Sequence, residues 1–163
     1  MSGPGVAIVE LLLWGAVATA VLSGIQFGAQ SVGFSRLSLP FLIGTCFSGN
    51  RRAAIAIGFV VYVLGGWLFA CLYFLLLASM GNGGWWLGAA LGAVHGCILL
   101  AIFMPILPYL HPRMASPYDG PVATTRLHPP GFLALHYGYA TPLVTVLSHA
   151  CYGAILGGGL TVA

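Results

Sequence analysis

The chain has 163 residues, of which 60% are hydrophobic and only 4% are charged, and its formal net charge is +3 at pH 7. Soluble domains carry about a quarter of charged residues, so this composition excludes an ordinary soluble protein. No lysine occurs and the arginines do not form a basic run, which excludes a nucleic-acid-binding patch. The composition instead predicts an all-α membrane protein.

The first apolar segment covers residues 6–29 and is long enough to cross a membrane, since about 20 residues of helix span roughly 30 Å of hydrocarbon. The preceding Met1–Gly5 stretch has no basic residue, and the apolar segment contains Glu10 and exceeds the length of a signal-peptide core. We therefore expect a retained transmembrane helix at the start of the chain.

Three further apolar segments of similar length follow, at residues 53–80, 85–108 and 140–162. None alternates between apolar and polar residues as a membrane-spanning strand would, and lipid accepts only helices or closed barrels. The sequence therefore predicts four transmembrane helices within one domain covering residues 1–163.

All the arginines lie in the first and third connections between these segments: Arg36, Arg51, Arg52, Arg113 and Arg126. The positive-inside rule places arginine-bearing connections in the cytoplasm. Both termini are then expected on the non-cytoplasmic side of the membrane.

The two halves of the chain resemble each other. Residues 14–25 align with residues 87–98, and in the connections residues 35–42 align with residues 125–133, where arginine, proline and a Phe-Leu pair recur in order. This similarity predicts two parallel-oriented helix-loop-helix repeats, at about 6–80 and 85–162, the second with a longer cytoplasmic loop at 109–139.

Small residues recur at four-residue spacing in three of the segments, a pattern that lets transmembrane helices approach closely. We predict that they serve helix packing within the chain. The third and fourth segments contain Gly88, Gly92, Gly96, Gly153 and Gly157, and the first contains Ala16, Ala20, Gly24 and Gly28.

Residues suited to catalysis are scarce, because no paired carboxylates, phosphate-binding glycine loop or metal-ligand spacing occurs. The four cysteines are scattered and form no C-x-x-C pair, so we interpret them as buried, inert thiols. The sequence thus predicts a protein that is not an enzyme. Arg36 and Arg126 are predicted to bind backbone carbonyls, lipid phosphate or the acidic groups of a partner, and Arg113 is predicted to contact a partner or lipid.

Two histidines, His95 and His149, lie inside the third and fourth segments, each beside its own glycine row. A neutral imidazole hydrogen-bonded to a neighbouring helix is the favoured interpretation, because an unpaired imidazolium is costly in the membrane. The alternative is that the two rings together bind a haem b or a chlorin, for which histidine is a common axial ligand. The favoured interpretation requires no cofactor.

Three stretches carry a resemblance to a known family: Leu107-Pro-Tyr-Leu-His111-Pro-Arg-Met-Ala-Ser116, Pro130-Gly-Phe-Leu-Ala-Leu-His-Tyr-Gly138 and residues 141–157. The chain from Leu39 onward resembles an uncharacterised family of bacterial four-span integral membrane proteins. The resemblance implies a bacterial inner-membrane location and four spans. It implies no activity, cofactor or site residue.

Together these features favour a non-catalytic accessory or scaffold subunit of a larger membrane complex, such as a respiratory or photosynthetic one. Its expected partners are other membrane-protein subunits and lipids. A small-solute or lipid carrier is the alternative suggested by the internal repeat, and an electron- or energy-transfer subunit is the further alternative if the histidines bind a pigment.

Overall fold

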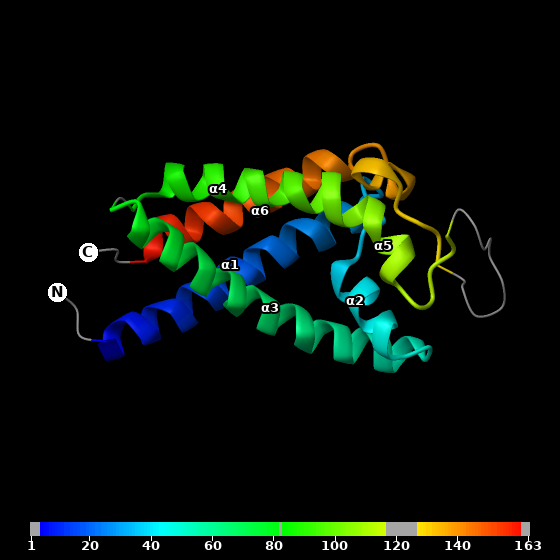
Figure 1. Cartoon of the computed structure of the whole chain (residues 1–163), viewed down its shortest axis with the longest axis horizontal. Coiled ribbons are helices and arrows are strands. Elements are labelled where there is room, and N and C mark those ends of the chain that lie inside the picture. The colour runs from blue at the N-terminus through cyan, green and yellow to red at the C-terminus, as the bar shows by residue number, and fades with distance from the viewer. Residues whose placement is uncertain (1–3, 82, 117–126, 161–163) are drawn as a thin grey trace. The chain divides into compact units, whose positions relative to one another are not determined.

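The computed structural model describes residues 4–81, 83–116 and 127–160, and every regular element in these ranges is helical (Figure 1). An isolated parallel bridge between Met114 and Leu127 is the one piece of β pairing among them. In chain order the elements are α1 (Pro4–Ser31), α2 (Leu39–Phe47), α3 (Arg51–Ser79), α4 (Trp85–Ile98), η1 (Leu99–Phe103), α5 (Met104–Leu110), η2 (Phe132–Tyr137) and α6 (Thr141–Gly159).

Three helical stretches are long and apolar enough to cross a membrane: Ile8–Ser31, Arg51–Ser79 and Trp85–Leu110. They correspond to the first three predicted spans, so the all-helical class is confirmed, together with three helices that could cross a membrane. α6 has 19 residues but is not among these three, because polar side chains such as Thr145, Ser148 and His149 lower its apolar character.

The third of these stretches changes its helical winding where it meets prolines. α4 passes into η1, a π-helical turn in which the amide of Met104 donates to the Leu99 carbonyl, and α5 follows with Pro105 and Pro108. Proline has no amide hydrogen to donate to the preceding turn, and a π turn is one way to insert such a residue without ending the helix. The helix therefore continues to Leu110.

The structure divides into two compact units. Unit 1 comprises residues 1–25, 63–96 and 146–163, and unit 2 comprises residues 26–62 and 97–145. Each unit draws on both halves of the chain, so the units do not correspond to the two predicted repeats.

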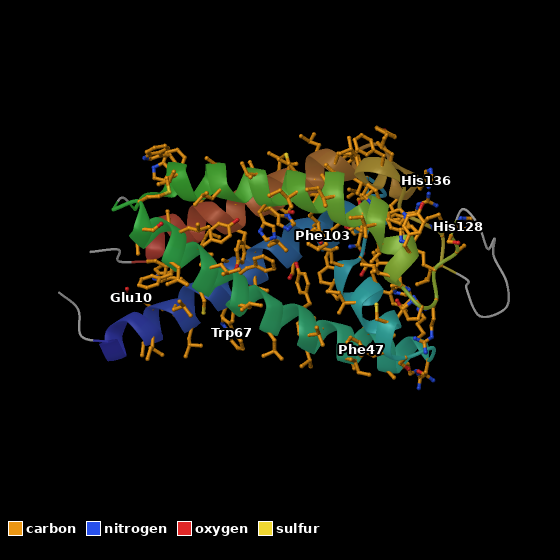
Figure 2. The ribbon with its side chains drawn as sticks, viewed as in Figure 1. Glu10, Phe47, Trp67, Phe103, His128 and His136 are labelled. Carbon is orange, nitrogen blue, oxygen red and sulfur yellow. The ribbon has the colours of Figure 1, made fainter. Side chains whose placement is uncertain are left out.

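In unit 1, α1 and α3 meet where small residues allow close contact. A Cβ placed on Gly15 would lie 2.7 Å from Cδ1 of Trp67, and one placed on Gly66 would overlap the side chain of Thr19. The Trp67 indole also donates a hydrogen bond of 3.1 Å to the Leu12 carbonyl (Figure 2). Glycine thus makes room for the bulky partner in this contact.

In unit 2, α2 packs against the beginning of α3 with the two backbones in contact. A Cβ on Gly44 would overlap the Ala54 carbonyl, and one on Gly58 would overlap the Pro40 carbonyl. α2 starts with Pro40 in its first turn, where the missing amide hydrogen is harmless. Asn50 caps α3, because its Oδ1 accepts from the amides of Arg52 at 3.0 Å and Ala53 at 3.2 Å.

The two connections that suggested a repeat take different conformations. The first forms the α-helix α2, whereas the described part of the second forms η2, in which Leu133 and Ala134 have φ values of 55° and 57°. The repeat architecture stays a prediction. The expectation of buried thiols is wrong for Cys97 and Cys151, which are exposed, because their helices turn those positions outward.

Candidate functional site

A cluster of polar and aromatic rings lies inside unit 1, where His95 of α4 meets His149 of α6 and Tyr73 of α3. The ring centroids of His95 and His149 are 4.9 Å apart, with their planes at 75°. Nδ1 of His95 lies 3.4 Å from the Tyr73 hydroxyl. Phe69 covers the His95 ring at a centroid distance of 4.3 Å. The cluster therefore links three helices.

Tyr152 extends this cluster. Its ring meets Tyr73 edge to face at 5.5 Å, and its hydroxyl donates to the Gly66 carbonyl on α3. Edge-to-face aromatic pairs are favourable beyond their buried area, and a hydroxyl in an apolar surrounding needs a partner. Tyr73, His149 and Tyr152 are nearly inaccessible, with 3%, 4% and 3% of their surface exposed.

Glycines bring the two histidine-bearing helices together. A Cβ on Gly92 would overlap the His149 carbonyl, and Cβ atoms on Gly88 and Gly153 would each overlap the other residue's carbonyl. Gly157 meets the backbone of Gly84 and Gly88 in the same way. We call these contacts the α4–α6 seam. Gly96, the remaining predicted packing glycine, is buried on α4.

The geometry of the two histidines does not suit a shared tetrapyrrole. An axial pair must face each other across the iron, with the macrocycle between the rings. His95 and His149 instead touch edge to face at 4.9 Å, which leaves no space for such a plane. Within the described residues no three His, Cys, Asp or Glu side chains come together as a metal site. The observed ring packing therefore favours structural histidines, and the binding of a haem or chlorin stays a prediction.

A second polar cluster lies in unit 2, where the turn after α5 meets α2. The amide of Arg113 donates to Nδ1 of His111 at 3.1 Å, so that nitrogen carries no hydrogen and Nε2 is the protonated one. Nε2 of His111 then donates to the Leu42 carbonyl at 3.0 Å and lies 3.2 Å from the Thr45 hydroxyl. His111 is 4% exposed, so this ring fixes the turn against α2.

Arg113 binds the carboxyl end of α2. Its Nη1 donates to the carbonyls of Thr45 at 2.6 Å and Cys46 at 3.1 Å. A cation is favourable at this end of a helix because the last carbonyls lack helical partners. Burial raises the pKa of the Cys46 thiol, and the positive charge of Arg113 opposes that rise.

Arg36 also binds backbone. Its Nη2 donates to the His136 carbonyl at 2.9 Å, and its amide donates to the Tyr137 carbonyl at 2.7 Å. The Tyr137 hydroxyl donates to the carbonyl of His128, and burial raises the pKa of Tyr137 to about 12. Figure 2 labels His128 and His136 on this segment. Arg126, the other arginine predicted to contact partners or lipid, lies outside the described residues.

Sequence reasoning identified His95, His149 and the glycine rows but not the residues around them. Tyr73 and Phe69 gave no signal, because an aromatic residue in an apolar segment is indistinguishable there from a lipid-facing one. His111 was treated only as part of the resemblance. Its position two residues before Arg113, just after a proline-containing helix end, could have marked it as a turn residue.

Comparison of the chain with protein families, with curated proteins and with solved structures finds no match.

Proposed function

We propose that the protein is a non-catalytic bacterial inner-membrane protein with four spans, acting as an accessory or scaffold subunit of a larger membrane complex. Its outward surface supports this proposal more strongly than its interior does. The interior clusters hold helices together through side chains and backbone carbonyls, as structural groups do.

The supporting observation is a row of small residues on the outer side of α1. Ala16, Ala20, Gly24 and Gly28 are all exposed, and a Cβ on either glycine would meet nothing within 4 Å, so the prediction that this row packs within the chain is wrong. We call this set the α1 row. Small residues at this spacing let a second helix approach closely in lipid, where packing drives association. A transmembrane helix of another subunit is the partner that such a surface fits.

α6 supports the proposed fourth span. Its 19 residues extend about 28 Å as a helix, close to the hydrocarbon thickness. Its polar residues Thr141, Ser148 and His149 are buried, whereas Leu143 and Leu147 are exposed. A helix that turns its polar side chains inward can cross a membrane although its average composition is less apolar. An even number of spans places both termini on the same side of the membrane. The distribution of the arginines indicates that this is the non-cytoplasmic side.

Co-purification tests the proposal. A tagged chain isolated from native membranes in mild detergent should carry a membrane protein in fixed stoichiometry, identified by mass spectrometry. The double variant Gly24→Leu/Gly28→Leu should lose that partner at least about tenfold, because two added side chains prevent close approach of a helix. The variant itself should fold, since both positions are open.

The matched control is Gly65→Leu on α3, another glycine with nothing within 4 Å but outside the α1 row. It should retain the partner. Isolation of the wild-type chain as a lone monomer, or equal loss of the partner in the control, would contradict the scaffold function. Reporter fusions at both termini test the four-span topology, which requires the two ends on the same side.

A further inference from the structure

The arginines of unit 2 differ in how their charge is used. Arg36 and Arg113 bind backbone carbonyls, whereas the side chains of Arg51 and Arg52 are exposed and bond to no residue that the structure describes. The described part of unit 2 contains no aspartate or glutamate that could neutralise them. Among the described residues of unit 2, these two adjacent positive charges therefore have no anionic partner.

A third arginine adjoins the same turn. Arg51 and Arg52 directly follow the turn formed by residues 48–50, and Nε of Arg113 lies 3.4 Å from the position of a Cβ on Gly49. The first amides of α3 are already bound by Asn50, so the guanidinium groups, and not the helix end, would bind an anion. Arginine suits phosphate because its planar donors bind two oxygens at once.

Apolar side chains continue from these charges along α3. Ile55 is four residues beyond Arg51 and three beyond Arg52, and Phe59 is four residues beyond Ile55, so these residues share one face of the helix. Ile55 is 48% exposed and Phe59 is 50% exposed. From Arg51 to Phe59 this face extends about 12 Å. Phe47, at the end of α2, is also exposed (Figure 2).

We propose that this surface, formed by Arg51, Arg52, Arg113, Ile55 and Phe59, binds an anionic phospholipid. Arg51 and Arg52 bind the phosphate, and Arg113, whose Nη1 is already bonded to backbone carbonyls, adds its positive charge beside them. Ile55 and Phe59 contact an acyl chain. Charge followed by an apolar stripe matches the order of groups in a lipid, whereas a free phosphate would leave the stripe unused. Anionic lipids of the cytoplasmic leaflet attract arginines at helix ends, by about fivefold in affinity for each charge.

Native mass spectrometry of the full chain in detergent tests this site, with phosphatidylglycerol and phosphatidylcholine as probes. The wild-type chain should bind phosphatidylglycerol at least about tenfold more tightly than phosphatidylcholine. Arg51→Gln/Arg52→Gln should weaken phosphatidylglycerol binding about 30-fold and leave phosphatidylcholine binding unchanged. Both side chains are exposed, so this variant should unfold at the same temperature as the wild type.

Two further variants separate the alternatives. Arg36→Gln removes a charge outside this surface and should retain phosphatidylglycerol binding within about twofold. A weakening as large as that of Arg51→Gln alone would overturn the site in favour of a general charge effect. Ile55→Ser/Phe59→Ser should also weaken phosphatidylglycerol binding, and an unchanged affinity would overturn the acyl-chain contact. Displacement of the lipid by excess inorganic phosphate would show a free-anion site and overturn the proposal. These results do not depend on whether the α1 row binds a subunit.

Discussion

Glycines at four-residue spacing meet opposite surroundings in the α4–α6 seam and the α1 row. In the seam, Gly88, Gly92 and Gly153 lie against backbone carbonyls of the facing helix, whereas Gly24 and Gly28 face open space. The sequence pattern is the same in both. The pattern therefore indicates that another helix can pack closely at these glycines. Only the structure shows whether that helix belongs to the same chain.

The largest expected effect comes from Gly92→Ala in the seam. The added methyl group would overlap the His149 carbonyl, which is backbone and cannot rotate away. We expect the free energy of unfolding in mild detergent to fall by about 3 kcal/mol. Gly65→Ala, at an open position on α3, is the control and should not lower stability. A fall of less than about 1 kcal/mol for Gly92→Ala would show that the seam can separate easily.

A smaller loss is expected for Gly58→Ala, where α2 meets α3. The methyl group would overlap the Pro40 carbonyl, but α2 has only nine residues and can shift as a unit. Such a shift would disturb the bonds from Arg113 to the Thr45 and Cys46 carbonyls. We expect a loss of about 2 kcal/mol in the same unfolding measurement.

Arg113→Met in the Gly58→Ala background provides the check on this interpretation. If the shift of α2 has already broken the arginine bonds, the second substitution should cost less there than in the wild-type chain. Additive losses would show that α2 stays in place and that the strain is absorbed elsewhere.

The polar cluster beside the seam should contribute less than the glycines. Tyr73→Phe removes the hydroxyl that lies 3.4 Å from Nδ1 of His95 and leaves the ring packing intact. The contact is long for a hydrogen bond, so we expect the free energy of unfolding to fall by about 1 kcal/mol. Tyr139→Phe, at a residue with 90% of its surface exposed, is the control and should have no effect.

The positions of the long helices could be predicted from the sequence, whereas the neighbours of individual side chains could not. Apolar length located α1, α3 and the α4–α5 stretch to within a few residues, because lipid imposes a minimum length on any span. The structure adds that the side chain of Asn50 caps the start of α3. By contrast, α2 lies where only the loop of the first repeat was predicted, since nine residues are too few to produce a clear periodic signal.

The site was predictable only where a residue is chemically unusual in its segment. A histidine in an apolar run is conspicuous, so His95 and His149 were identified, but Tyr73 and Phe69 resemble ordinary apolar residues. The outward direction of Cys97 and Cys151 was missed for a related reason, because a membrane protein exposes apolar side chains to lipid. Polar side chains still indicate the buried side of α6, but an apolar side chain can lie on either side of such a helix, so its burial cannot be predicted.

The smallest effect should have the opposite sign and concerns Gly24→Ala in the α1 row. Nothing lies within 4 Å of the position of the new methyl group, and the residue is inside a regular helix. Alanine restricts the unfolded chain more than glycine and is the better helix former. The free energy of unfolding of the isolated chain should therefore rise by about 0.5 kcal/mol. The same substitution in the presence of the proposed partner subunit should weaken the complex, because alanine is the larger residue at a close helix contact. A higher stability of the isolated chain together with a weaker complex would show that the α1 row is uncovered in the isolated chain and covered by the partner in the complex. A loss in the isolated chain would instead mean that the row already packs against this protein's own helices.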